Sequence, residues 1–111
     1  MHELGLCSSI VDAVERRAGE RPVAQVRVRV GRLHHVHEGA FEQSFAIAAV
    51  GTVAEGAAAE LVLLPVRTSC GDCHVTWEGE DLPLACPACG SVNISVVGGD
   101  ELVLESIEYR G

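Results

Sequence analysis

The chain has 111 residues and a mass of 11.7 kDa, enough for one compact domain or two very small ones. Apolar residues make up 48% of the sequence and charged residues 22%, a balance that excludes a wholly disordered chain. The formal net charge is −8, and all eight basic residues are arginines. Residues 51–111 hold two arginines against ten acidic residues. This half is therefore a poor partner for nucleic acid, and is either a solvated acidic face or a docking surface for a basic partner.

The sequence predicts neither a membrane helix nor a secretory signal. Its longest apolar run, residues 61–66, is far shorter than the roughly 20 residues that span a bilayer. The first residues lack the basic region and apolar region of a signal peptide. We therefore expect a cytoplasmic protein that does not bind membranes.

The first predicted elements are a helix and a strand. Apolar side chains recur at helical spacing over residues 4–18, and Gly19 is a natural stop for this helix. Cys7 lies on the apolar face of the helix and is expected to be an ordinary core residue. Valines alternate with polar side chains within residues 23–30, which is typical of a half-buried strand.

A turn rich in histidine leads into a second predicted helix over residues 38–50, in which two phenylalanines are four residues apart. We expect a helical turn over residues 55–59 and a strand over residues 61–67. Pro65 lies inside this strand, which indicates an edge position or an early end.

Two more strands are predicted over residues 91–97 and 101–109. Gly98, Gly99 and Asp100 lie between them and indicate a hairpin.

Together the elements indicate an α+β fold, with two helices on a small mixed sheet and an inserted four-cysteine zinc-ribbon domain. We expect residues 1–67 and 91–111 to form the larger domain. Residues 68–90 form the inserted one.

The strongest motif is a double Cys-x2-Cys arrangement, in which Cys70 and Cys73 precede Cys86 and Cys89 by a spacer of twelve residues. This spacing predicts a tetrahedral Zn²⁺ site with a complete shell of four thiolates and no open position for catalysis. The metal would fold an insert that is too small and too polar to fold alone.

Other interpretations of these cysteines stay open. Two disulfides are disfavoured without a secretory signal. A thioredoxin-like redox pair is also disfavoured, because it would leave the second Cys-x2-Cys pair without a role. Iron in a rubredoxin-like centre uses the same ligands, but we favour zinc. Gly71 and Gly90 are expected to adopt left-handed backbone conformations. His74 is expected to be a surface residue rather than a replacement for one of the sulfurs.

The first three residues, Met1, His2 and Glu3, offer a second set of metal ligands. The α-amine of Met1, the backbone nitrogen and imidazole of His2, and the backbone nitrogen or carboxylate of Glu3 can surround one ion. Such nitrogen-rich ligation suits Ni(II) or Cu(II) better than Zn(II) or Mg(II). A histidine at position 2 is weak evidence alone, and the turn histidines His34, His35 and His37 form a competing cluster.

Several motifs occur in one order along the chain, and together they are far more specific than any one alone. They are the start Met1-His2-Glu3-Leu4, the segment Val28-Arg29-Val30-Gly31-Arg32-Leu33, the helix with Phe41 and Phe45, the two Cys-x2-Cys pairs, and the ending Gly99-Asp100-Glu101-Leu102 followed by Ile107-Glu108. In this order and at this length, they resemble the HypA family of hydrogenase maturation proteins, the nickel-insertion metallochaperones.

The resemblance implies a two-part protein, in which Met1, His2 and Glu3 supply ligands to Ni(II) and the four cysteines hold structural zinc. It also implies two partners, a HypB-type GTPase and the large-subunit precursor of [NiFe]-hydrogenase, with urease maturation proteins as additional clients in some organisms. Some family members have a histidine beside each cysteine pair. This chain has only His74, so we do not expect histidine exchange at the zinc site. A monomer and a homodimer are both compatible with the sequence.

Two other classes of protein are alternatives. One is a zinc-ribbon module that binds protein or nucleic acid and has no nickel function, although the net charge of −8 disfavours nucleic acid. The other is an electron carrier with iron at the cysteines. An enzyme is the class least favoured, because the zinc shell is complete and no nucleophile–base pair or phosphate-binding glycine loop is visible.

Overall fold

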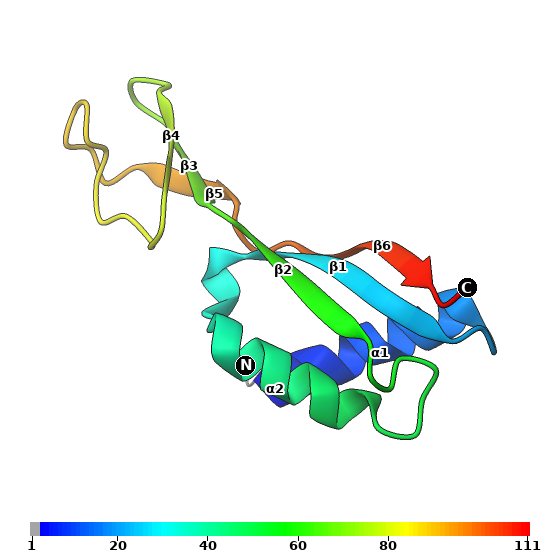
Figure 1. Cartoon of the computed structure of the whole chain (residues 1–111). Helices are drawn as coiled ribbons and strands as arrows, with labels where there is room; N and C mark the ends of the chain where they lie inside the picture. The colour runs from blue at the N-terminus through cyan, green and yellow to red at the C-terminus, as the bar shows by residue number, and fades with distance from the viewer. Residues whose placement is uncertain (1–2) are drawn as a thin grey trace.

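The computed structural model describes residues 3–111 as an elongated α+β molecule of 53 × 21 × 17 Å (Figure 1). Two helices and one three-stranded sheet form a first lobe, and a second three-stranded sheet forms a smaller lobe that projects from it. The elements are α1 (Glu3–Ala18), β1 (Val23–Gly31), a 3-10 turn η1 (Arg32–His34), α2 (Glu38–Ala49), β2 (Ala58–Leu64), β3 (Val66–Cys70), β4 (Thr76–Gly79), β5 (Ile94–Gly98) and β6 (Leu102–Tyr109). The predicted fold class is confirmed.

The first sheet has the order β2-β1-β6, with β1 parallel to β2 and antiparallel to β6. The predicted alternation in β1 is confirmed, because Val26, Val28 and Val30 are buried on one face. On the opposite face, the guanidinium of Arg27 binds the carboxylates of Glu60 in β2 and Glu105 in β6. The outer face of the sheet therefore carries ion pairs that link its three strands.

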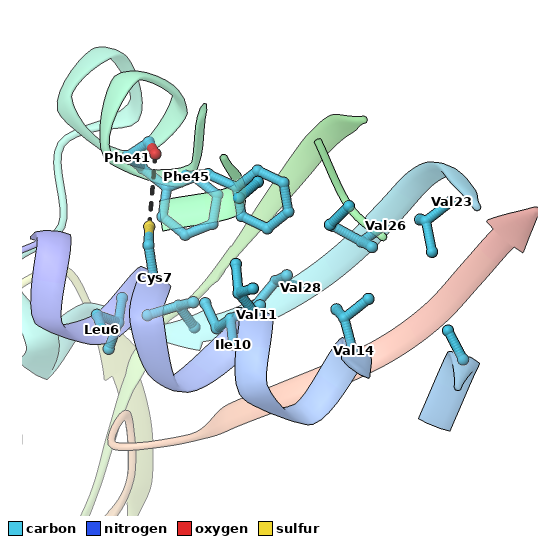
Figure 2. Close-up of a cluster of buried hydrophobic side chains, with 14 residues drawn as sticks. Leu6, Cys7, Ile10, Val11, Val14, Val23, Val26, Val28, Phe41 and Phe45 are labelled. Atoms are coloured by element: carbon cyan, nitrogen blue, oxygen red, sulfur yellow. Dashed lines mark hydrogen bonds between the residues drawn. The ribbon is translucent and has the colours of Figure 1, made fainter. Parts of the chain in front are cut away.

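Helices α1 and α2 cover the inner face of this sheet, and their apolar side chains form the core (Figures 1 and 2). Phe41 and Phe45 are completely or almost completely buried, with ring centroids 6.4 Å apart. The Cys7 thiol is also fully buried and donates to the carbonyl of Phe41 at 3.5 Å (Figure 2). The prediction that Cys7 is a core residue is confirmed. Gly19 has a φ of +64° and ends α1 as expected.

The second sheet has the order β4-β3-β5, with both outer strands antiparallel to β3. It uses residues 66–98, on both sides of the predicted insert 68–90, and we call these residues the second lobe. The division into a domain of residues 1–67 and 91–111 and a domain of residues 68–90 stays a prediction.

Two local predictions are wrong. The two strands at the C-terminal end do not form a hairpin, because β5 pairs with β3 and β6 pairs with β1. The glycines between them link the two sheets instead. Ala58 and Ala59 are extended rather than helical, because parallel pairing with Gln25 and Val26 overrides the helix propensity of alanine. Pro65 behaves as expected, because β2 is an edge strand that ends at Leu64.

The two lobes meet where two backbone segments cross at Gly31 and Gly99. The N–H of Gly31 donates to the carbonyl of Glu101 at 2.8 Å, and the N–H of Leu33 donates to the carbonyl of Gly99 at 2.9 Å. A Cβ atom on Gly31 would overlap the Gly99 carbonyl, and Gly99 itself has a φ of +120°. Both positions therefore require glycine.

We expect Gly31→Ala to lower the free energy of unfolding by about 3 kcal/mol, because the added methyl group forces the crossing apart. Thermal denaturation should show a melting temperature lower by about 10 °C or more. Gly39→Ala is the matched control, because Gly39 lies in α2 with no atom near the position of an added Cβ. This variant should be unchanged or more stable by up to about 1 kcal/mol. Equal melting temperatures for the two variants would contradict the tight crossing.

Neither helix in the described part of the chain is long and apolar enough to cross a membrane.

Candidate metal centre

The four cysteines lie on two similar turns at the end of the second lobe farthest from the helices (Figure 1). Cys70 is the last residue of β3, and its sulfur accepts the backbone N–H groups of Asp72 at 3.4 Å and Cys73 at 3.5 Å. The sulfur of Cys86 accepts the N–H of Ala88 at 3.4 Å in the same way. We call residues 70–74 the first knuckle and residues 86–90 the second knuckle.

The structure brings the four predicted sulfurs together. All four lie within 4.8 Å of one another, with 3.7 Å between Cys70 and Cys89 and 3.6 Å between Cys73 and Cys86. Four sulfurs about 2.3 Å from a tetrahedral Zn²⁺ ion are about 3.8 Å apart. A disulfide needs sulfurs at about 2.05 Å, so the cysteines are free. The donor set and its spacing fit a tetrahedral metal ion.

The ionisation of the thiols also favours a cation. Backbone N–H groups of Cys73 and Asp72 lower the pKa of Cys70 from 9.0 to about 6. The N–H of Ser91 acts on Cys89 in the same direction, but desolvation and the three neighbouring sulfurs outweigh it and raise the pKa of Cys89 to about 12. The neighbouring sulfurs therefore oppose the ionisation of Cys89. A divalent ion at the centre of the four sulfurs removes this opposition.

The backbone of the knuckles differs in one respect from the prediction. Gly90 is left-handed as expected, with a φ of +76°, but the corresponding residue of the first knuckle is His74, with a φ of +63°. The expectation for Gly71 is wrong. Gly71 is needed for space, because a Cβ there would lie 2.5 Å from the side-chain nitrogen of Asn93. His74 is exposed, as expected of a surface residue.

A side-chain network between the first knuckle and residues 91–93 was not predicted from the sequence. The carboxylate of Asp72 accepts hydrogen bonds from the hydroxyl of Ser91 and, at 3.1 Å, from the side-chain amide of Asn93. Ser91 and then Asn93 hold the pKa of Asp72 below its usual 3.8. The visible signal was an aspartate between two cysteines, and a Ser-x-Asn sequence one residue after the second pair.

Of the three predicted nickel ligands, Met1 and His2 lie outside the described residues. Glu3 is the first residue of α1, and its carboxylate accepts the backbone N–H of His37 at 3.3 Å. The start of α1 therefore lies beside the start of α2.

The turn histidines do not converge on one point. The Nε2 atom of His34 lies 2.9 Å from the carbonyl oxygen of Asp100. His35 and His37 line a hollow of about 260 Å³ between the lobes, together with Glu80 and Asp81. Among the described residues, the four cysteines are the only group of three or more potential ligands close enough to share one ion. The structure therefore gives no support to a histidine site.

The sequence matches the family described as "Hydrogenase/urease nickel incorporation, metallochaperone, hypA" over residues 1–109. The chain belongs to the HypA family. It is 37% identical to the hydrogenase maturation factor HypA of Thermomicrobium roseum over 99% of this chain and 98% of the relative. It is also 37% identical to the hydrogenase maturation factor HybF of Escherichia coli K12 over 99% of this chain and 100% of that protein.

The fold is similar to that of a HypA structure. The solution structure of the Ni metallochaperone HypA from Helicobacter pylori matches with a TM-score of 0.68 at 24% identity, and the match covers 98% of this chain and 97% of that one. The family is one of nickel metallochaperones for hydrogenase maturation, so the predicted resemblance is confirmed. In this chain, four cysteines also lie close enough together to hold one metal ion.

Cys7 is the remaining thiol and should react unlike the other four. Desolvation by burial, followed by the charge of Glu3, raises the pKa of Cys7 from 9.0 to about 11. After chelation of metal at about pH 8, we expect four thiols to react rapidly with Ellman's reagent and Cys7 only after denaturant is added. Cys7→Ser should lack the slow thiol. Five equally fast thiols would contradict the burial of Cys7.

The same shift gives a pH dependence of stability. The folded state keeps the Cys7 proton to higher pH than the unfolded chain, because its pKa is about 11 instead of 9.0. The contribution to stability is complete below pH 9 and is lost as the pH rises toward about 11.

Proposed function

We propose that this protein binds Ni(II) at its N-terminus and delivers it for the maturation of [NiFe]-hydrogenase, while the four cysteines hold a structural Zn²⁺ ion. The observation that carries the proposal is the match to a nickel-incorporation metallochaperone family over residues 1–109. The cysteine geometry described above supports the zinc assignment.

The proposed nickel ligands come from Met1, His2 and Glu3. The α-amine of Met1 and the backbone nitrogen and imidazole of His2 supply three nitrogen atoms. The backbone nitrogen or the carboxylate of Glu3, which accepts the N–H of His37 through one oxygen, completes the set. A terminal chelate suits a carrier, since its ligands can leave the ion one at a time during transfer.

The zinc ion would be held by Cys70, Cys73, Cys86 and Cys89, and when bound it supplies the cross-link that folds the second lobe. A shell of four thiolates leaves no position for substrate or water. The protein is accordingly proposed to be a carrier and not an enzyme. Residues 68–90 are proposed as a zinc-ribbon domain inserted between residues 1–67 and 91–111.

The proposed partners are a HypB-type GTPase and the hydrogenase large-subunit precursor, with urease maturation proteins as further clients. The excess of acidic residues over residues 51–111 favours a basic surface on one of these partners, and association should then slow as salt is added. We propose a cytoplasmic site of action, where the immature subunit is synthesised.

A metal titration tests the proposal. Protein whose first residue is Met1 should contain one zinc per chain and bind one further Ni(II) ion, followed by calorimetry or absorbance. Zinc without any bound nickel would contradict the carrier function and leave a zinc-ribbon module that binds protein or nucleic acid. A red protein with iron at the cysteines would instead indicate an electron carrier.

A further inference from the structure

The two knuckles are joined by residues 75–85, of which only Thr76–Gly79 are paired, as strand β4 against β3. Residues 80–85 form no helix or strand and include Leu84, which is 93% exposed. The position of the second knuckle relative to the first therefore depends on contacts outside this connection.

Backbone hydrogen bonds supply some of these contacts. The N–H of Gly71, in the first knuckle, donates to the carbonyl of Asn93 at 2.7 Å. The N–H of Cys86, in the second knuckle, donates to the carbonyl of Ser91 at 2.8 Å. Residues 91–93 are therefore bonded to both knuckles.

The Asp72 carboxylate bonds to this same segment from the first knuckle. One of its oxygens accepts the Ser91 hydroxyl, and the other accepts the side-chain amide of Asn93. The Ser91 oxygen in turn accepts the backbone N–H of Asn93 at 3.0 Å. Because Asp72 lies between the ligands Cys70 and Cys73, these bonds join the two halves of the metal shell through one side chain.

We propose that Asp72 is a positioning residue that fixes the two knuckles relative to each other and so sets how slowly the cysteines release their metal. The proposal rests on the proposed zinc site. Residues that orient metal ligands typically change metal affinity by 10–100-fold. Hydrogen bonds to a carboxylate are also about twice as strong as bonds between neutral groups.

The sign of the effect separates this role from a simple effect of charge. A shell of four thiolates around Zn²⁺ carries a net negative charge, and a nearby carboxylate repels it. If Asp72 acted only through its charge, its removal would strengthen metal retention. If it fixes the knuckles, its removal weakens retention.

The experiment measures the rate at which bound metal transfers to an excess of a chromogenic chelator. We expect Asp72→Ala to release Zn²⁺ about 10–100-fold faster than the parent. Asp72→Asn keeps one acceptor oxygen, loses the charge and should lie between the two. Asp81→Asn is the matched control, because it removes the same charge in the same lobe without altering the knuckles, and it should release zinc at the parental rate.

Two further measurements test whether Asp72→Ala releases metal faster only because its cysteine site is disrupted. Co(II)-loaded Asp72→Ala should keep the parental thiolate–cobalt absorption spectrum, which shows that four sulfurs still bind. Ser91→Ala should accelerate release, and the double variant should be less impaired than the product of the two single effects. Parental or slower release from Asp72→Ala, or purely multiplicative effects in the double variant, would overturn the proposal.

The result is independent of the nickel function. Co(II) probes the cysteine site whether or not the N-terminus binds nickel. A failure to bind Co(II) in the parent would contradict the four-cysteine metal site itself, and with it the positioning role of Asp72. Normal Co(II) binding with equal release rates in parent and variant would contradict only the positioning role of Asp72.

Discussion

His2→Ala should abolish tight binding of Ni(II) and leave the zinc content, far-UV circular dichroism and melting temperature unchanged. The imidazole is the one side-chain nitrogen in the proposed chelate, and loss of a direct ligand should cost more than the roughly 10–100-fold typical of outer-shell residues. Calorimetric titration of the parent and the variant measures the difference directly. Binding by the parent should also weaken below about pH 6.5, because the imidazole and the α-amine must lose their protons to bind.

Acetylation of the Met1 α-amine provides an independent test of the same chelate. It leaves His2 in place but converts the terminal amine into an amide, so it should weaken nickel binding as much as His2→Ala does. His35→Ala is the matched control and should keep parental affinity, because the turn histidines do not converge with other ligands in the described residues. Full affinity in the acetylated protein, together with loss in His35→Ala, would move the nickel site to the turn.

Cys70→Ser should lose the bound zinc and unfold the second lobe, while α1 and α2 stay helical. Cys70 is 1% exposed, and its sulfur accepts two backbone N–H groups. Structural zinc contributes about 10–16 kcal/mol to the folding of small zinc domains, far more than this polar sheet can replace. Elemental analysis gives the zinc content, and the fluorescence of Trp77 in β4, the single tryptophan of the chain, reports on the second lobe.

Cys7→Ser provides the control, because Cys7 lies in the core of the first lobe and is not part of the sulfur cluster. This variant should keep one zinc per chain and parental Trp77 fluorescence, with a modest loss of global stability. A Cys70→Ser protein that retains zinc and an unchanged fluorescence spectrum would contradict the structural role of the metal.

Elements with strong local periodicity could be predicted from the sequence. The apolar spacing of α1 and the alternation of β1 give the correct element and the correct buried face, because each pattern is complete within one segment. The supposed hairpin around Gly98 and Gly99 was wrong for the opposite reason. A glycine-rich link between two strands looks the same whether the strands pair with each other or with β3 and β1, and the choice depends on residues that are distant in sequence.

At the metal site, too, local sequence patterns could be predicted and contacts between distant segments could not. The cluster of four cysteines follows from spacing, since two Cys-x2-Cys turns have few other uses in one small chain. The hydrogen bonds of Asp72 could not be predicted, because Ser91 and Asn93 are common residues that meet Asp72 only when the second knuckle lies against the first. Met1 and His2 were assigned from chemistry and the resemblance, and their assignment stays a prediction.

Two connections join the lobes beside the crossing of Gly31 and Gly99. The connections leave the second lobe from the paired strands β3 and β5 and enter the first sheet at β2 and β6, on opposite sides of β1. Rotation of the small lobe about the long axis must therefore strain both edge strands at once. A single connection would instead allow one lobe to rotate freely relative to the other. With two connections, the lobes are held along one axis of 53 Å, so a partner that binds the cysteine end also fixes the orientation of the helical lobe.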